Sequence, residues 1–564
     1  MEWIIYLIAI AVIIAVVFVN GTIQERKQYK RFVVSLKENF GKRYEQTEPQ
    51  TDIQKIADYH RKMVQNGASA DFCLDDITWN DLSMDEIFLE MNATQSTVGA
   101  EYLYHLLRCP SLSEENRQEW DKLAAFFMTH EKERIEIQKL MHHIGRIKKF
   151  SLTEILYYML ELEREGNVLH YILDVLLVLS FAAIFVVPGF GTLLFLSMLA
   201  VSIISYFKRK GEIAPYFTTF LYILNMLGTA RKIKKLGYEQ LSVYTEQMEE
   251  IDKKFAGFKK HTYLLSSGTH TILDSPIELL LDYIRMIFHV DIIKFNSMLK
   301  MVQERIGEIE QLRGILGRLD AAIAVASYEC SLAYCCTPEF VTDKKTGLSM
   351  EEAYHPLVAN PVSNSIQTEN GVLITGSNAS GKSTFLKTVA VCAILAQTIG
   401  VVPAKSYRGS FFRIYSSMAL KDSIQAGESY YIVEIKSLKR IIDAGEQETP
   451  LLCFVDEVLR GTNTVERISA SSQILKSLAK PHVLCFAATH DIELTHMLEK
   501  LYTNYHFNEE VREDDIVFSY HLHSGRTETR NAIQLLSIMG YEPLVIRQAE
   551  KTAAHFMETG EWVI

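Results

Sequence analysis

The sequence is short of positive charge, of paired cysteine motifs and of repeats. Its 58 Lys and Arg residues against 69 Asp and Glu residues give a net charge of −11, which disfavours a polyanion-binding surface over the whole chain. No pair of Cys-x-x-Cys motifs with zinc spacing is present, and Cys330, Cys335 and Cys336 have no nearby histidines at ligand spacing. The sequence shows no repeat of about 20–50 residues and no low-complexity tract, so a repeat array is not indicated. We expect reduced, buried thiols at all eight cysteines: Cys73, Cys109, Cys330, Cys335, Cys336, Cys392, Cys453 and Cys485.

Charge is also missing from two long apolar stretches. Residues 3–19 carry no charged side chain, and the next one is Glu25. Residues 169–207 contain one, Asp174, and are interrupted by Pro188-Gly189-Phe190-Gly191. Because a helix needs roughly 20 apolar residues to cross a bilayer, with about 17 as the lower limit, we expect one transmembrane helix and then a hairpin of two short ones. A cleaved signal peptide is the alternative for the first stretch. It is disfavoured because no Lys or Arg precedes the stretch and no clear small-residue cleavage site follows.

Clusters of positive residues lie at one end of each of these stretches. They follow the first stretch and the hairpin, and the hairpin turn has none: Arg26, Lys27, Lys30 and Arg31, then Lys208, Arg209 and Lys210. Because positively charged loops stay in the cytoplasm, three spans place the N-terminus outside and both large segments inside. The sequence thus predicts a multi-pass protein of the cell (inner) membrane. We expect its basic clusters to meet anionic lipid or solvent more readily than DNA.

The pattern of the chain changes along its length. Residues 25–168 and 208–340 have apolar residues at every third or fourth position and few Gly or Pro, which predicts helices. The apolar run from Tyr216 to Leu227 is short, so we expect a core helix there and not a fourth span. After about Pro338, β-rich runs alternate with helical segments, which predicts a parallel sheet with crossover helices. The expected units are an N-terminal transmembrane helix (1–24), a helical core in two parts (25–168 and 208–345), a transmembrane hairpin (169–207) and an α/β domain (346–564).

A glycine-rich loop follows the first β-rich run of the α/β domain. The segment GVLITGSNASGKSTFLKT fits the phosphate-binding pattern G-x-x-x-x-G-K-[ST]. Its glycines let backbone N–H groups face phosphate oxygens, Lys382 reaches the β- and γ-phosphates, and Ser383 coordinates Mg²⁺. A glycine turn that binds no nucleotide is the alternative, disfavoured because the loop follows a strand and opens a helix. The expected ATP-binding residues are Gly376, Ser377, Asn378, Ala379, Ser380, Gly381, Lys382, Ser383 and Thr384.

Two further apolar strands end in residues suited to hydrolysis. In PLLCFVDEVLRGTNT, Asp456 is placed to hold Mg²⁺ and Glu457 to orient or deprotonate the attacking water. An acidic pair after a strand is more often a solvated strand end, but this one lies in the same domain as the loop. In HVLCFAATHDIELT, His490 stands at the strand tip and is a candidate for contact with the γ-phosphate or the water, the alternative being a structural histidine. Ligands bind at the carboxyl ends of parallel strands, so we expect these residues to meet there.

These motifs resemble the ATPase domain of the MutS family, which is related to the ABC ATPases. The resemblance covers most of residues 353–550 and ends in a segment, Ala532 to Ala553, similar to the family's dimer-forming helices. More weakly, Asn92 to Pro110 and Leu316 to Pro338 resemble parts of the MutS helical core. In chain order the motifs are His355-Pro356, TGSNASGKST, Val402-Pro403-Ala404, LKDSIQAGESYYIVEI, VDEVLRGTNT and AATHDIELT.

The resemblance implies a homodimer with shared ATP sites. Ser429 would contact the γ-phosphate of the nucleotide bound by the other copy, and Asn378 would contact nucleotide in its own loop. Glu457 and His490, with Lys382, would serve hydrolysis. ATP binding would then close the dimer and move the helical levers.

The departures from the family pattern bear on DNA. We expect no mismatch-reading domain, because the segment that resembles the core begins before residue 100, and Phe88-Leu89-Glu90 matches the family's Phe-x-Glu wedge in letters only. Glu428 replaces the family's usual Arg, and the hairpin interrupts the core near the place of the DNA clamp. The sequence therefore predicts a membrane-anchored MutS-like ATPase acting on DNA, largely without sequence preference, or on an unknown protein partner. The alternatives are an ABC-like transport machine and an ATP-binding scaffold with little turnover.

Overall fold

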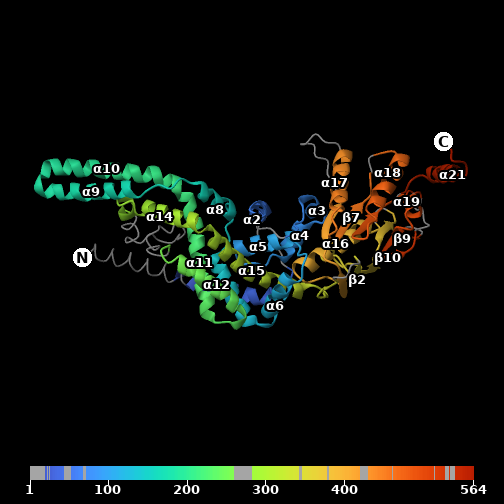
Figure 1. The fold of residues 1–564 in the computed structure, drawn as a ribbon, viewed down its shortest axis with the longest axis horizontal. Helices are drawn as coiled ribbons and strands as arrows, with labels where there is room; N and C mark the ends of the chain where they lie inside the picture. Colours follow the sequence, from blue (N-terminus) through green and yellow to red (C-terminus); the bar gives the residue numbers. More distant parts are fainter. Residues whose placement is uncertain are drawn as a thin grey trace.

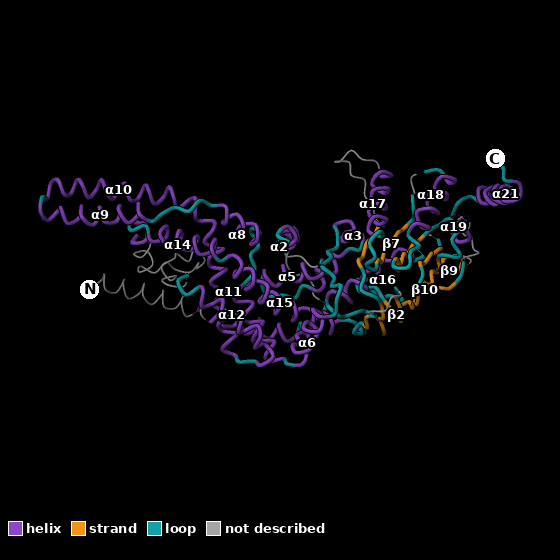
Figure 2. Tube along the Cα trace, in the orientation of Figure 1, coloured by secondary structure: helices purple, strands orange, loops and turns teal. Residues whose placement is uncertain are grey.

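The computed structural model shows an elongated molecule with helices at one end and an α/β domain at the other (Figures 1 and 2). It describes residues 20–21, 23–24, 26–43, 52–67, 71–258, 283–341, 346–377, 380–418, 430–459, 462–512, 515–526, 533, 536 and 540–563. The predicted first transmembrane stretch, residues 3–19, lies outside these ranges.

The first half of the chain is helical, as the apolar spacing predicts. Beyond a helical stretch at 26–38, the helices are α2 (Ile53–Gln65), α3 (Asp76–Asp81), α4 (Met84–Met91), α5 (Thr97–Arg108), α6 (Glu115–Thr129), α7 (Glu131–Ile144), α8 (Leu152–Glu161), α9 (Val168–Val186), α10 (Pro188–Ile213), η1 (Ala214–Tyr216), α11 (Phe217–Leu236), η2 (Glu239–Leu241), α12 (Ser242–Lys254), α14 (Val290–Glu304) and α15 (Ile306–Ser331). Phe220 and Met226 of α11 are fully buried, which confirms a core helix there.

The long helix α15 is the axis of the helical region, and α5 packs against it. A Cβ on Gly99 of α5 would lie 2.2 Å from Asp320 Oδ2, so only glycine permits this approach. Asp320 accepts hydrogen bonds from Ser96 Oγ (2.6 Å) and from backbone N–H groups at the start of α5. Arg313 pairs with Glu101 at 2.7 Å, both side chains buried. The two segments that resemble the MutS core are thus neighbours in space.

The Phe-x-Glu letters fall in the helical core. Phe88 of α4 is fully buried, and Glu90 forms an ion pair with Arg43 at 3.0 Å. A buried phenylalanine cannot act as a wedge, so the interpretation as a coincidence holds.

Helices α9 and α10 form an antiparallel pair that projects from the helical end (Figure 1). Both helices are long and apolar enough to cross a membrane, and only 17% of the most apolar stretch of each is buried. Gly191 lets the two helices approach, because a Cβ there would lie 2.5 Å from the backbone of Ala183. At the base of the pair, Asp174 Oδ1 lies 3.1 Å from His289 Nδ1. The length and composition fit the expected hairpin, and the base of that hairpin is tied to the helical core.

The second half of the chain holds two sheets. Its elements are β1 (Glu339–Phe340), β2 (Leu348–Ala353), β3 (Asn364–Thr368), β4 (Gly371–Thr375), α16 (Lys382–Thr398), β5 (Ser406–Gly409), β6 (Arg413–Ser417), α17 (Tyr430–Ala444), β7 (Leu451–Asp456), α18 (Thr464–Ser477), β8 (Val483–Ala488), α19 (Ile492–Met497), β9 (Tyr502–Arg512), β10 (Asp515–Ser524) and α21 (Pro543–Thr559). One sheet has the order β10-β9-β4-β8-β7-β6, parallel except for β10. The other has the order β1-β5-β2-β3 and mixed directions. The α/β prediction is confirmed; the second sheet and the antiparallel edge strand were not predicted.

The helical region and the α/β domain are joined by buried hydrogen bonds. Asp81 of α3 accepts from Ser416 Oγ (2.7 Å) and from the N–H of Met418 (2.9 Å), beside β6. Ser111 donates its N–H to the carbonyl of Gln397 at 2.9 Å, and Gln397 lies at the end of α16. Strand β6, at the edge of the sheet, and helix α16, which follows the glycine-rich loop, therefore both contact the helical region.

The expected state of the cysteines is wrong at several positions. Cys73 and Cys109 form a disulfide, and Cys330 is exposed. The disulfide forms because the backbone N–H of Leu74 donates to the carbonyl of Arg108 at 2.7 Å, which brings two distant segments side by side. Cys335 and Cys336 are half-buried free thiols, and Cys392, Cys453 and Cys485 are buried free thiols as expected.

Candidate nucleotide site

The glycine-rich loop joins β4 to α16 as the motif predicts. Gly376 has φ 151° and Gly381 has φ 104°, conformations that side chains rarely adopt. A Cβ on Gly376 would also lie 2.8 Å from Ser380 Oγ and 3.1 Å from the carbonyl oxygen of Phe507. Both ends of the loop therefore require glycine for the chain to turn from the strand into the helix.

Lys382 closes the loop at the first turn of α16. Its Nζ donates to the carbonyl oxygens of Gly376 (2.9 Å) and Ser377 (2.7 Å) and lies 3.5 Å from His490 Nε2. The residue is 5% exposed. The amine is thus held between the loop and the tip of β8, where a phosphate group on the loop would meet it.

Asp456 ends β7 beside the start of α16. Ser383 Oγ donates to Asp456 Oδ2 at 2.5 Å. The two residues meet because β8 lies between β4 and β7, with Ala488 paired to Ile374 on one side and to Asp456 on the other. A hydroxyl and a carboxylate oxygen are hard ligands of the kind that Mg²⁺ prefers.

Glu457 has a left-handed backbone, with φ 59°. Such a conformation costs a non-glycine residue about 1–3 kcal/mol and tends to occur at functional sites. It is held by a hydrogen bond from the Glu457 N–H to the carbonyl of Ala488 at 2.9 Å. The turn carries the carboxylate toward β8, where Glu457 Oε1 lies 2.8 Å from His490 Nε2. Both side chains are partly exposed, so water can reach them.

Other residues around this edge were missed by the sequence reasoning. Arg467 of α18 makes two hydrogen bonds to Asp491, at 3.0 and 2.6 Å, and Asp491 directly follows His490. Glu434 of α17 is buried and accepts the backbone N–H of Leu459 at 2.5 Å. These residues fix the loops after β7 and β8. The position of Asp491 next to the histidine was a usable sequence cue; nothing in the sequence marked Glu434.

A cavity of about 300 Å³ opens beside the loop. Its lining includes His355, Asn364, Gly381, Thr384, Phe507 and Tyr520. Burial, with a smaller effect of Lys387, lowers the pKa of His355 to about 4, so the imidazole is neutral near pH 7. Among the described residues, no group pairs with the buried His355 Nε2. Aromatic walls and a neutral hydrogen-bonding ring suit a nucleobase.

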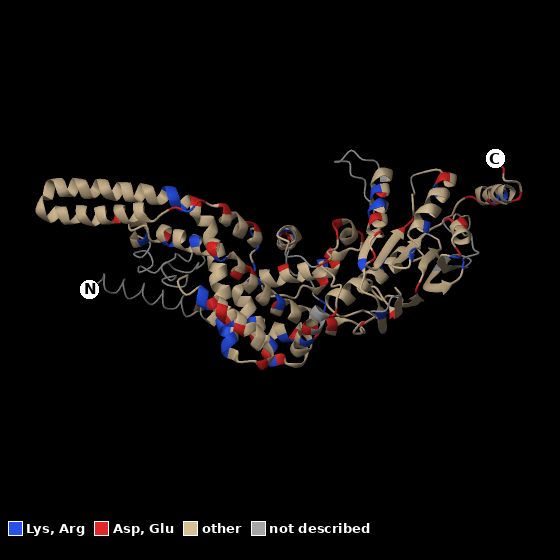
Figure 3. Ribbon diagram, viewed as in Figure 1, with Lys and Arg blue, Asp and Glu red and all other residues tan. Residues whose placement is uncertain are grey.

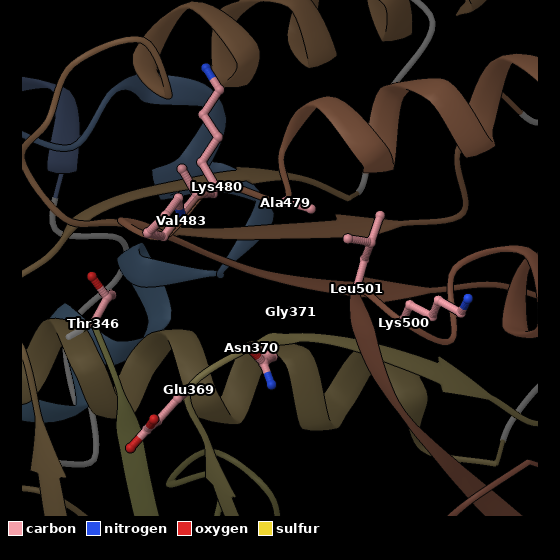
Figure 4. Close-up of a pocket in the computed structure, with 10 residues that line it drawn as sticks. Thr346, Glu369, Asn370, Gly371, Ala479, Lys480, Val483, Lys500 and Leu501 are labelled. Carbon is pink, nitrogen blue, oxygen red and sulfur yellow. The ribbon is translucent and has the colours of Figure 1, made fainter.

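A second cavity of about 360 Å³ lies at the opposite edge of the sheet (Figure 4). Gly371 and Val483, which begin β4 and β8, line it together with Lys480 and Lys500. It is therefore at the amino ends of these strands, away from the glycine-rich loop. Parallel sheets bind ligands at the other edge, so we assign this cavity no part in the nucleotide site.

The structure brings together most of the predicted site residues. Lys382, Ser383, Asp456, Glu457 and His490 gather at the carboxyl ends of β4, β7 and β8. Gly376, Ser377, Ser380 and Gly381 form the described part of the loop, and Thr384 lines the adjoining cavity. Asn378, Ala379 and Ser429 lie outside the described residues.

Comparisons with known proteins agree with this geometry. A model of the family described as MutS domain V matches residues 372–557, which hold the loop, the acidic pair and His490. MutS protein homolog 4 of Mus musculus is 32% identical over 267 residues, or 44% of this chain and 27% of that protein. MutS protein homolog 4 of Homo sapiens is 29% identical over 290 residues, 48% of this chain and 30% of that protein. The matches thus span less than a third of these relatives' length. Residues 372–557 therefore belong to the MutS domain V family, as an α/β domain of the ATPase type.

Proposed function

We propose that this chain binds ATP with Mg²⁺ and hydrolyses it. The observation that carries the proposal is the meeting of Lys382, Asp456 and Glu457 at one sheet edge, beside a loop that glycine alone permits. Members of the family with domain V are ATPases, which supports the same activity here.

The residues at this edge fit a magnesium-bound triphosphate. Ser380 Oγ is buried, and no group among the described residues pairs with it, so a phosphate oxygen would satisfy it. Ser383 and Asp456 would hold Mg²⁺ by their oxygens. When bound, the ion neutralises charge on the phosphate oxygens.

Hydrolysis then depends on side chains of this chain. Glu457 accepts the proton of the attacking water, and its carboxylate is oriented by His490 at 2.8 Å. Lys382 stabilises the negative charge that collects on the β- and γ-phosphates. The cavity of about 300 Å³ beside the loop would hold the adenine.

Nucleotide binding by the detergent-solubilised chain tests the proposal. We expect Lys382→Ala to weaken binding of a fluorescent ATP analogue about 10- to 100-fold, because a charge-assisted contact is lost. Lys405→Ala is the matched control, since Lys405 is an exposed lysine that pairs with Glu352. Wild-type protein that binds no analogue, or equal affinities in both variants, would contradict the proposal.

The proposed assembly is a homodimer with shared sites, in which Ser429 of one copy reaches the nucleotide of the other. Large apolar side chains on and beside α21 support a second copy as partner. Leu544 is 58% exposed, and Trp562 is 69% exposed. Cross-linking in detergent, with and without ATP, measures the assembly.

The proposed location is a membrane, with α9 and α10 spanning it, the N-terminus outside and the large segments in the cytoplasm. The hairpin carries exposed apolar side chains such as Val186, 81% exposed, and is almost free of charge along its length (Figure 3). Arg209 at its base pairs with Glu165 at 3.0 Å, and Lys210 pairs with Asp291. These two cations are therefore engaged within the protein, and Lys208 is left as the contact to anionic lipid in that cluster.

Transport through the hairpin has less support. The charged residue within the apolar stretch of the hairpin is Asp174. Its carboxylate contacts His289 at the base of the hairpin. Transport sites show more polar residues inside the membrane. An ATP-binding scaffold with little turnover would appear as analogue binding without phosphate release.

DNA is the proposed partner of the ATP-driven change, with an unidentified protein as the alternative. Several basic residues of the helical region already pair with acidic ones, among them Lys254 with Glu308 and Lys234 with Glu249. These paired residues contribute less positive charge to a DNA-binding surface. Any DNA contact would be largely sequence-independent and would weaken steeply with salt. Fluorescence anisotropy with homoduplex and mismatched DNA, across a salt series, measures both properties. A clear preference for the mismatch would overturn sequence-independent binding.

A further inference from the structure

Two histidines and two cysteines meet where α2, α5 and the segment before α3 come together. His60 is on α2, His105 is on α5, Cys109 follows α5 and Cys73 precedes α3. His60 Nδ1 lies 3.0 Å from His105 Nδ1, and Cys109 Sγ lies 3.9 Å from each of these nitrogens. Cys73 is bonded to Cys109. The ligand atoms of His60, His105 and Cys109 all lie within 4.8 Å of one another.

The separations among His60, His105 and Cys109 resemble those around a tetrahedral zinc ion, and Cys73, next to Cys109 through the disulfide, would be the fourth ligand. With Zn–N near 2.0–2.1 Å and Zn–S near 2.3 Å, tetrahedral geometry puts two nitrogens about 3.3 Å apart and a nitrogen and a sulfur about 3.5 Å apart. The nitrogen pair and both nitrogen–sulfur pairs are within a few tenths of an ångström of these values. Without a metal, one neutral ring can donate its Nδ1–H to the bare Nδ1 of the other; a metal ion would take the lone pairs of both nitrogens.

The surroundings favour the ligating forms of the side chains. His60 and Cys109 are buried and His105 is half-buried. Burial, and for His60 also the neighbouring His105, lowers the pKa of His60 to about 3 and that of His105 to about 4. Both rings are therefore neutral near pH 7, which is the form that binds metals.

We propose that, with Cys73 and Cys109 reduced, the side chains of His60, Cys73, His105 and Cys109 bind one Zn²⁺ as a structural site. The inference is independent of the ATP chemistry and goes beyond it. A small thiol reductant gives two electrons and two protons to the Cys73–Cys109 bond and is itself oxidised to a disulfide. The two cysteine thiols release their protons when zinc binds. Disulfide and zinc are thus alternative states of the same four residues.

The site lies where it can stiffen the joint with the ATPase domain. Three residues after Cys73, α3 begins, and its Asp81 is hydrogen-bonded to Ser416 and Met418 beside β6. Two residues after Cys109, Ser111 pairs with Gln397 at the end of α16. Helix α16 starts at Lys382 of the glycine-rich loop. A zinc ion would tie together two of the chain segments through which the helical region contacts this domain.

Metal content of the reduced full chain in detergent tests the proposal. We expect about one zinc per chain after exchange against a weak chelator, and loss of that zinc in Cys109→Ser and in His60→Ala. Cys330→Ser is the matched control, since Cys330 is an exposed cysteine outside the cluster, and it should keep the metal. Zinc retained equally in Cys109→Ser and Cys330→Ser would overturn the proposal.

Cobalt substitution gives a readout that does not depend on the folding of the variants. Reduced wild-type protein loaded with Co²⁺ should show the visible bands of a tetrahedral site and a thiolate-to-cobalt charge-transfer band. Oxidation to the disulfide should abolish both. A reduced wild-type protein whose cobalt spectrum lacks these bands would also overturn the proposal.

Discussion

His490 Nε2 lies 2.8 Å from Glu457 Oε1, although the two residues follow different strands, β8 and β7. The contact exists because Glu457 adopts a left-handed backbone directly after β7. In this structure His490 therefore contacts the carboxylate of Glu457. Its proposed role in hydrolysis is to orient that carboxylate, which is the proposed base.

Replacing His490 should slow hydrolysis without abolishing nucleotide binding. In His490→Ala the carboxylate of Glu457 loses its partner, and we expect the turnover rate to fall on the order of 10²-fold, less than when the base itself is lost. Phosphate release under saturating ATP, beside analogue binding, measures both effects. His496→Ala is a suitable control because His496 lies on α19, outside the loop after β8. An unchanged turnover rate in His490→Ala would contradict the role.

Ser383 should set the magnesium requirement. Ser383→Ala removes a hydroxyl ligand and the hydrogen bond to Asp456, so we expect the Mg²⁺ concentration for half-maximal hydrolysis to rise roughly tenfold. The measurement is the ATPase rate over a Mg²⁺ series at fixed ATP. A magnesium dependence equal to that of the wild type would remove Ser383 from the proposed ion site.

The free energy of unfolding should fall as the pH rises, because of the buried carboxyl group of Asp320. Burial raises the pKa of Asp320 from 3.8 to about 6, so between these values the folded protein holds a proton that the unfolded chain releases. The free energy of unfolding therefore falls over this range, on the order of 3 kcal/mol at 1.36 kcal/mol per pKa unit. Thermal melting from pH 4 to 7 should show a decline that Asp320→Asn lacks. Parallel pH profiles for the two proteins would count against this assignment.

The hairpin tip should face the outside of the cell. A Cβ added at Gly189 or at Gly211 meets no atom within 4 Å, so a cysteine is a suitable substitution at both positions. We expect a membrane-impermeant maleimide to label Gly189→Cys in intact cells and to label Gly211→Cys only after permeabilisation. The exposed native Cys330 should follow the second pattern in the wild type, so both variants also carry Cys330→Ser. Equal labelling of the two variants in intact cells would contradict the proposed orientation.

The arrangement of the nucleotide site was largely predictable from local sequence. The loop from Gly376 to Gly381 is defined by residue types at fixed spacing, and the runs that end at Thr375, Asp456 and Ala488 are continuous apolar strands. Parallel strands place their carboxyl ends at one edge, so a common site follows from the pattern alone. The register that puts Asp456 beside Ser383 confirms that reasoning.

Contacts between distant segments were not predictable in this way. The left-handed turn at Glu457 depends on a hydrogen bond to Ala488 of another strand. That pairing cannot be inferred from the residues around Glu457 alone. The meeting of Cys73 with Cys109 likewise follows from the pairing of Leu74 with Arg108, and no ligand-like spacing announces it. Both the turn and the disulfide depend on contacts between distant segments, which local sequence propensity does not predict.

The most direct test of the account is the rate of ATP hydrolysis by Glu457→Gln. The amide keeps the shape of the side chain but cannot accept the proton of water, so we expect the rate to fall about 10²- to 10⁴-fold while ATP binding is kept. Glu448→Gln, an exposed glutamate before β7, is the matched control and should hydrolyse ATP at the wild-type rate. Equal rates in Glu457→Gln and Glu448→Gln would contradict the assignment of Glu457 as the base.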